Sequence, residues 1–334
     1  MLLTPTPSNP IPEGGEVAQV TARDGTPLRA AFWPARTDTP LGTVCIMQGR
    51  AEFIEKYAEV VEELLTRGFA VAAFDWHGQG GSWRALREAR KGHVASFRHY
   101  RRDLQAIAER MARWHFPAPF FGLAHSMGGA IALDAARVGK LPFERLVVTA
   151  PMLGLAGLKR PRLTAVTARV LARLGFARLW IPGGRETPPT AHPFAGNPLT
   201  GDRRRYERNA EIAAAYREGA IGEPTIGWVA AAFRTMARLA SPRAALAIRT
   251  PTLIVAAGAD EICETAVAEQ FGRRLKGGGV IVIPGARHEI LMERDAIRAQ
   301  FWAAFDAFIP GSQTYAPPDS PITDESLSAA RQKG

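Results

Sequence analysis

A serine held between small residues is the first candidate for chemistry in this chain. Ser126 follows the apolar run at residues 119–123 and lies between Ala124 and Gly128. Small neighbours two positions away on either side let the backbone turn sharply from strand to helix and expose the hydroxyl, as in a nucleophile elbow. The usual pattern is G-x-S-x-G, and Ala124 replaces the first glycine. Ser126 is therefore a candidate nucleophile; the alternative is a serine that only caps the helix predicted at 129–138.

Two later residues could complete the chemistry of a serine nucleophile. A serine needs a base that takes its proton and an acid that orients the base. Asp260 ends the apolar run that starts at residue 252, and His288 follows the run at 279–283. An isolated Asp after a strand more often caps a helix, and an isolated His is more often structural. The order Ser, Asp, His, each just past a predicted parallel strand, is the order of α/β-hydrolases and favours the catalytic interpretation.

Backbone donors for a developing oxyanion can also be proposed. The N–H of Met127 directly follows the candidate nucleophile and begins a helix whose dipole favours negative charge. The second donor in such a fold comes from the loop after the third strand, residues 48–52. Gly49 lets this loop turn, so the N–H of Arg50 is the candidate. The alternative for this loop is an ordinary helix entry stabilised by Glu52.

Composition predicts one large core without a metal or a disulfide framework. The chain has 334 residues, of which 46 % are hydrophobic. Cys45 and Cys263 are predicted to be reduced thiols. Residues 1–15 contain four prolines and lack the features of a secretion signal, and no apolar run approaches the roughly 18 residues of a membrane span. These features predict a cytoplasmic protein, with peripheral contact to the inner membrane face left open.

The positive charge is concentrated in one segment. The chain carries a net charge of +10, and residues 152–243 hold 15 Lys and Arg against 6 Asp and Glu, a net charge of +9. A basic surface suggests nucleic acid or anionic lipid as a partner, although genomic bias toward arginine gives the same composition. No helix-turn-helix, zinc or RNA-binding signature is present, so no nucleic-acid partner is expected.

Neither a cofactor nor a metal is predicted. The glycine-rich residues 75–82 follow a predicted strand but lack the Lys-Ser/Thr of a P-loop and the G-x-G-x-x-G spacing. They are interpreted as a tight turn close to the site. The histidines outside the proposed triad are not spaced as metal ligands.

Strands alternate with helices, which predicts an α/β protein with a mostly parallel sheet covered on both faces. The alternation stops at Pro151 and resumes at Pro251, which implies an inserted, mainly helical lid over the carboxyl ends of the strands. The predicted organisation is a flexible N-terminus (1–15), a core (16–151 and 244–310), the lid insertion (152–243) and a disordered tail (311–334).

The first predicted helix of the lid is basic and amphipathic. Five apolar residues alternate with arginines in it: Leu163, Val166, Val170, Leu174 and Phe176. Such a helix can rest on an anionic membrane surface. Alternatively, its apolar side packs on the core over the active site and its arginines are only solvated.

Several motifs together resemble one family, the α/β-hydrolases of the lysophospholipase and monoacylglycerol lipase group. The resemblance extends over about residues 15–310. It is carried by residues 48–53, 75–82, 125–129, 258–260 and 285–289, and in the lid by 197–200 and 224–228. One departure is Gln48, where many relatives have histidine.

The resemblance implies an α/β-hydrolase fold with Ser126, Asp260 and His288 as the catalytic triad, and Met127 and Arg50 as oxyanion donors. It implies hydrolysis of a lipid-like ester such as a lysophospholipid or monoacylglycerol. A general carboxylesterase, an aminopeptidase of the same fold and a non-catalytic lipid-binding protein are the alternatives. The headgroup, the acyl-chain length and the oligomeric state are not predicted.

Overall fold

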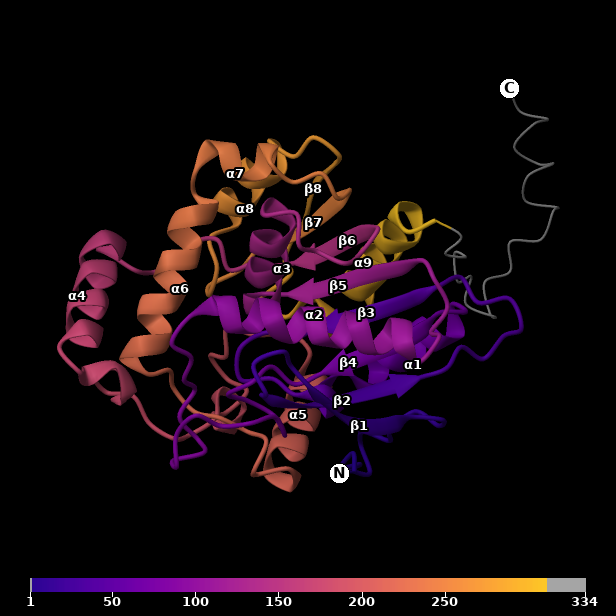
Figure 1. Cartoon of the computed structure of the whole chain (residues 1–334), viewed down its shortest axis with the longest axis horizontal. Helices are drawn as coiled ribbons and strands as arrows, with labels where there is room; N and C mark the ends of the chain where they lie inside the picture. Colours follow the sequence, from indigo (N-terminus) through magenta and orange to yellow (C-terminus); the bar gives the residue numbers. More distant parts are fainter. Residues whose placement is uncertain (1, 311–334) are drawn as a thin grey trace.

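The computed structural model describes residues 2–310. The predicted disordered tail, 311–334, lies outside the described residues. The chain forms one eight-stranded sheet between layers of helices (Figure 1). Among the described residues, no helix combines the length and apolarity needed to cross a bilayer.

The sheet is mostly parallel, as predicted. The hairpin of the first two strands is antiparallel, β2 also pairs antiparallel with β4, and every later pairing is parallel. In sheet order the strands are β1 (Glu16–Thr21), β2 (Pro27–Trp33), β4 (Ala70–Phe74), β3 (Thr43–Met47), β5 (Phe120–His125), β6 (Arg145–Thr149), β7 (Thr252–Ala257) and β8 (Gly278–Ile283).

Helices cover both faces of the sheet, and the strand sequences reflect this. On one face lie α1 (Ala58–Thr66) and α9 (Asp295–Phe308), and on the other α2 (Phe97–Arg113), α3 (Met127–Arg137) and α8 (Thr265–Gly272). Every residue of β3, β4 and β7 is buried. The sequence of a strand that is buried on both faces is a continuous run of apolar residues, not an alternation of apolar and polar residues.

The N-terminal segment makes defined contacts with the core, where the sequence predicts a flexible end. The indole Nε1 of Trp33 donates to the carbonyl oxygen of Pro12 at 3.0 Å. The side-chain amide of Asn9 donates to the carbonyl of Glu55 at 2.9 Å, and the N–H of Thr4 donates to the Glu55 carboxylate at 3.1 Å. Buried polar groups of the core therefore use this segment as a partner.

The 152–243 segment, hereafter the insertion, lies between β6 and β7. Its helices are α4 (Pro161–Arg173), α5 (Arg203–Ala215), α6 (Ile226–Leu239) and the start of α7 (Pro242–Leu246). Its short 3-10 turns are η2 (Phe176–Arg178) and η3 (Pro189–Ala191); η1 (Ile54–Tyr57) and η4 (Ile290–Met292) belong to the core. Helices α4 and α6 lie side by side at one end of the molecule (Figure 1).

Helix α4 turns its apolar stripe away from the core. Its side chains at positions 163, 166, 170 and 174 are each about half exposed or more, and Ala168 is its one buried residue. The part-buried side of α4 carries Ala165, Ala168, Leu171 and Ala172, and α4 packs against α6. The alternative in which this stripe packs over the active site is therefore wrong.

Ion pairs on Glu59 attach α5 to the core. Its carboxylate accepts from Arg205 and Arg208 of the insertion, each at 2.6 Å, and from Arg298 of α9 at 2.9 Å. Burial raises the pKa of Glu59, but the three arginines outweigh it and hold the pKa at about 2. A carboxylate with a lowered pKa stabilises the fold above its ordinary pKa, and this stability is lost as the pH falls toward the folded-state value.

We expect Glu59→Gln to destabilise the protein at pH 7 by on the order of 2 kcal/mol, because several charge-assisted hydrogen bonds are lost. The difference in unfolding free energy from wild type should shrink between pH 4.5 and about 2. Urea denaturation of wild type and variant at several pH values measures this difference. The matched control is Glu62→Gln, on the same helix α1 as Glu59. It removes an exposed ion pair with Arg36 and should change the unfolding free energy little. Equal effects of the two variants would contradict the role of Glu59.

Candidate active site

The backbone at Ser126 has the geometry of a strained elbow. Ser126 lies between β5 and α3 with φ +50° and ψ −110°, a backbone conformation that residues other than glycine rarely adopt. A Cβ on Gly128 would lie 2.3 Å from the carbonyl oxygen of Met47, so only glycine fits there. Ala124, at the other small position of the elbow, is fully buried.

The hydroxyl of Ser126 is directed to His288 and does not cap the helix. Ser126 occupies the N-cap position of α3 without a capping hydrogen bond from its side chain. Its Oγ lies 2.9 Å from Nε2 of His288. The capping alternative is therefore wrong, and the side chain is available for chemistry.

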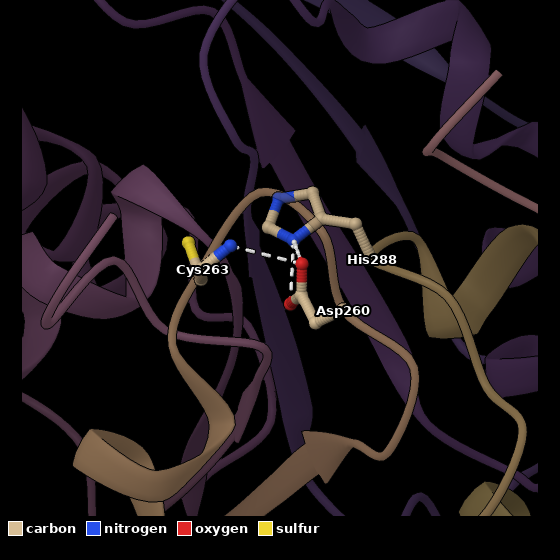
Figure 2. Close-up of side chains that lie close together, drawn as sticks. All are labelled: Asp260, Cys263 and His288. Atoms are coloured by element: carbon tan, nitrogen blue, oxygen red, sulfur yellow. Dashed lines mark hydrogen bonds and ion pairs between the residues drawn. The ribbon is translucent and has the colours of Figure 1, made fainter. Parts of the chain in front are cut away.

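Asp260 completes a chain of hydrogen bonds through His288. Nδ1 of His288 lies 2.8 Å and 3.0 Å from the two carboxylate oxygens of Asp260, which faces the ring in Figure 2. The backbone N–H groups of Ile262 and Cys263 donate to the same carboxylate. Burial raises the pKa of Asp260, but these hydrogen bonds outweigh it and leave the pKa below its ordinary value. The carboxylate is therefore ionised at neutral pH and can orient an imidazole.

Cys263 lies beside this pair, and the three side chains invite comparison with a metal site. Ligand atoms of Asp260, Cys263 and His288 lie within 4.8 Å of one another (Figure 2). However, both oxygens of Asp260 already bind His288, and burial raises the pKa of the Cys263 thiol, which opposes the thiolate that a metal needs. The donor chemistry favours a hydrogen-bonded catalytic pair over a metal centre.

The backbone N–H groups of the two candidate oxyanion donors are unpaired within residues 2–310. Met127 begins α3, and residues 49–51 follow β3, whose last residue, Met47, pairs with Ala124 of β5. In the described part of the chain, neither Met127 nor Arg50 uses its N–H to bond another protein group. The N–H groups of its neighbours Gly49 and Ala51 both donate to side chains. Arg50 differs from them because its N–H has no such acceptor. An oxyanion hole requires unpaired donors, so both N–H groups stay candidate donors.

A buried carboxylate holds the loop after β3. Glu52 accepts a hydrogen bond from the N–H of Gly49 at 2.5 Å and from the hydroxyl of Tyr57 at 2.7 Å. The ammonium of Lys56 bridges Glu52 and Glu289, at 2.6 Å and 2.7 Å. Burial raises the pKa of Glu52, but Lys56 and its hydrogen bonds outweigh it and lower the pKa. Glu52 therefore ties the loop to the side chains of Lys56 and Tyr57 in the following turn, η1.

The glycine-rich segment 75–82 supports the same loop from the other side. Gln79 donates from its amide to the carbonyl oxygens of Gly49 and Glu52, at 2.8 Å and 3.0 Å, and accepts from the N–H of Ala51 at 3.3 Å. The indole of Trp76 donates to the carbonyl of Gln48 at 2.9 Å. The segment predicted as a tight turn near the site thus positions the loop that carries a candidate oxyanion donor.

His125 is a second imidazole at the site, and it is kept neutral. Its Nδ1 lies 3.0 Å from Oγ1 of Thr149, and its ring centroid lies 4.9 Å from that of His288. Burial lowers the pKa of His125 to about 4 in spite of the nearby carboxylate of Glu52. A neutral ring beside His288 adds no charge to compete with the imidazolium that forms during catalysis.

Ser126 and His288 open onto a cavity of about 660 Å³. The insertion contributes most of its wall, including prolines of the 188–198 segment and Trp228 of α6. Phe53, Met152 and Leu155 are also in the lining. A largely apolar cavity of this size lies in the range of small-molecule sites, about 300–1,000 Å³, and suits an apolar chain next to the serine.

Comparisons with known proteins agree with this geometry. The profile of the family described as "Serine aminopeptidase, S33" matches residues 38–295. Lysophospholipase L2 of Escherichia coli strain K12 is 33 % identical over 297 residues, covering 84 % of each chain. The chain belongs to the S33 family of serine hydrolases. Human monoglyceride lipase is 31 % identical to this hydrolase over 149 residues, which cover 45 % of this chain and 46 % of the human protein.

Solved structures show the same fold. A soluble variant of monoglyceride lipase from Saccharomyces cerevisiae, in complex with a substrate analogue, superposes with a TM-score of 0.71 at 20 % identity. The match covers 90 % of the S33 hydrolase described here and 97 % of the yeast chain. The predicted α/β-hydrolase fold is confirmed.

The structure brings together all five residues that the sequence singles out. It adds Glu52, Lys56 and Gln79, whose role in holding the loop was not predicted. Gln79 lies within the segment 75–82 that the family motif marks, which is the one signal that could have pointed to it. Nothing in the local sequence pairs Lys56 with Glu289, because the two are 233 positions apart.

We expect Ser126→Ala to abolish labelling by a fluorophosphonate probe, because the probe reacts with an activated serine hydroxyl. Asp260→Asn should slow labelling less severely, since removal of the orienting acid costs less than removal of the nucleophile. In-gel fluorescence measures both. Ser241→Ala, a serine at the start of α7 without a side-chain capping bond, is the control and should label normally. Labelling of Ser126→Ala would exclude Ser126 as the nucleophile.

Proposed function

We propose that this S33-family enzyme hydrolyses the carboxylic ester of lysophospholipids through an acyl-enzyme. The observation that carries the proposal is the hydrogen-bonded chain from Ser126 through His288 to Asp260, at the edge of a largely apolar cavity. The lysophospholipase L2 relative, aligned over most of both chains, supports the same substrate class.

The geometry supports the following sequence of steps. The Oγ of Ser126 attacks the ester carbonyl while Nε2 of His288 takes the hydroxyl proton. Asp260 holds the imidazole and stabilises its charge, and the N–H groups of Met127 and Arg50 bind the oxyanion. His288 then gives the proton to the leaving glycerol oxygen, and the acyl chain remains on Ser126. Water, deprotonated by His288, hydrolyses this acyl-enzyme and restores the serine.

Arg50 favours a phosphate-bearing substrate over a neutral glyceride. Its guanidinium borders the cavity, stacks on the ring of Trp228 at 5.4 Å and donates to the carbonyl oxygen of Gly222. Its Nε has no partner among the described residues, and burial lowers the pKa of the guanidinium to about 10. A guanidinium at the cavity wall is suited to the phosphate of a lysophospholipid headgroup, although Glu223 of the same lining places a negative charge nearby.

Other substrate classes can be distinguished from lysophospholipids by a hydrolysis panel. Monoacylglycerols share the single acyl chain, and the monoglyceride lipase relatives support them. A general carboxylesterase would prefer short esters, and an aminopeptidase would prefer aminoacyl arylamides. A non-catalytic lipid-binding protein would turn over none of these, and the geometry of Ser126 and His288 argues against it.

We expect Arg50→Met to lower kcat/KM for lysophosphatidyl substrates about tenfold, because a hydrogen bond to a charged group is lost. Hydrolysis of monoacylglycerols should change little, since the substitution keeps the backbone N–H. A hydrolysis panel with lysophospholipids, monoacylglycerols, p-nitrophenyl esters and an aminoacyl arylamide measures both. Arg185→Met, an exposed arginine of the insertion outside the cavity, is the matched control. An equal loss on both lipid classes would show that Arg50 only braces the insertion.

We also propose that α4 rests on an anionic membrane surface, from which the substrate enters. The stripe Leu163, Val166, Val170 and Leu174 is exposed, and Leu179 beyond η2 is 51 % exposed. Arg162, Arg169 and Arg173 flank this stripe on α4. An exposed apolar stripe bordered by cations matches the boundary between acyl chains and anionic headgroups. The protein would then be cytoplasmic with peripheral contact to the inner membrane face.

Replacing Val166 and Val170 together by serine should weaken binding to anionic vesicles about tenfold, since two apolar side chains no longer enter the bilayer. Vesicle co-sedimentation at low and high salt measures binding. Val138→Ser, an exposed valine at the end of α3, is the control and should bind as wild type does. If the wild-type protein bound neutral vesicles as tightly as anionic ones, attraction by the arginines would be excluded.

A further inference from the structure

A second cavity, of about 570 Å³, lies between α4, η2 and α6 of the insertion and the core segment with His93 and Ala95. None of its lining residues also lines the cavity at Ser126. Its titratable side chains are all basic: His93, Arg169, Arg173, Arg178 and Arg234. We refer to this cavity as the arginine pocket.

The four guanidinium groups of the arginine pocket have no carboxylate partner among the described residues. Arg234 donates to the carbonyl oxygen of Ala95 at 2.8 Å, which leaves its charge uncompensated. Burial lowers the pKa of Arg234, and the nearby cations Arg238, Arg169 and Arg173 lower it further. This mutual repulsion shows that several positive charges face one space.

Several other arginines of the insertion have carboxylate partners. Arg205 and Arg208 share Glu59, and Arg238, one turn after Arg234, binds Asp134. The arginine pocket is instead lined by four arginines that face one cavity without a carboxylate in its described lining. Arg169 and Arg173 stand one turn apart on α4, where like charges destabilise a helix unless an anion lies between them. An anionic ligand would relieve this repulsion.

We propose that the arginine pocket binds a phosphate group. Guanidinium forks match pairs of phosphate oxygens, and a phosphate offers oxygens to several arginines at once, whereas a carboxylate offers only two. The imidazole of His93 is a further polar group in the lining of the same cavity, and its Nδ1 lies 2.8 Å from Oγ1 of Thr225. The inference goes beyond the proposed reaction, because the arginine pocket is separate from Ser126.

The surroundings favour the headgroup of a membrane lipid as the source of the phosphate. Val170 and Leu174 each directly follow a pocket arginine in α4, and both are exposed. A lipid phosphate in the arginine pocket could therefore leave its acyl chains along this apolar stripe. Free phosphate or a soluble phosphomonoester is the other source.

The test compares Arg173→Gln with Arg162→Gln. Both residues are exposed on α4, both substitutions remove one charge, and only Arg173 lines the arginine pocket. Vesicles of a neutral, phosphate-free ether glycolipid carry either ether-linked phosphatidate or a fatty acid at equal surface charge, and ether lipids offer no ester to hydrolyse. Thermal melting monitored by circular dichroism verifies that each variant is folded.

We expect Arg173→Gln to weaken binding to phosphatidate vesicles about tenfold more than Arg162→Gln does, because a charge-assisted hydrogen bond is lost in addition to general attraction. On fatty-acid vesicles the two variants should behave alike. Titration calorimetry with inorganic phosphate and glycerol 3-phosphate tests the soluble source. Saturable binding of these compounds that Arg173→Gln loses and Arg162→Gln keeps would support the site with a free-phosphate ligand.

Equal responses of Arg173→Gln and Arg162→Gln to every phosphate ligand would overturn the proposal. The arginine pocket would then contribute only diffuse positive charge to the surface. These measurements involve no ester hydrolysis, so their failure leaves the proposed reaction unaffected, and the failure of the reaction leaves the phosphate site unaffected.

Discussion

Ser126 reaches His288 because its backbone takes a conformation, with φ +50°, that residues other than glycine rarely adopt. The strain has to be supported by packing, and the support comes from small residues on both sides of the elbow. Gly128 lies against the backbone that follows β3, where any side chain would collide. The same close approach packs the start of α3 against the backbone that leads from β3 into the loop with Arg50. One steric constraint therefore bears on both the nucleophile and the loop that carries a candidate oxyanion donor.

The loop after β3 depends on a second set of interactions. Glu52 and Gln79 accept from the N–H groups on either side of Arg50, and Trp76 and Gln79 donate to carbonyl oxygens of the loop. A buried carboxylate is costly unless it is paired, and Lys56 pairs it. The loop is therefore held in place before substrate arrives, which is how preorganised donors stabilise a developing charge without rearranging.

Charge divides the insertion into two parts. Where α5 meets the core, arginines converge on Glu59 and act as attachment points. Around the arginine pocket, four arginines of α4, η2 and α6 have no carboxylate partner among the described residues, and the apolar stripe of α4 is exposed. The first part gives the cavity at Ser126 a fixed wall. The second part presents cations and apolar side chains outward, which is the chemistry of a surface that meets phosphate-bearing lipids.

The sequence alone determined the identity and order of Ser126, Asp260 and His288 and the mostly parallel sheet beneath them. A sharp turn after a buried strand demands small residues at fixed spacing, so this information is local. The roles of Glu52 and Gln79, the outward direction of the α4 stripe and the arginine pocket appeared only in the tertiary structure. Helical periodicity shows that a helix has an apolar side, but not which neighbour covers it. Residues as distant as His93 and Arg234 share a cavity only after packing has joined their elements.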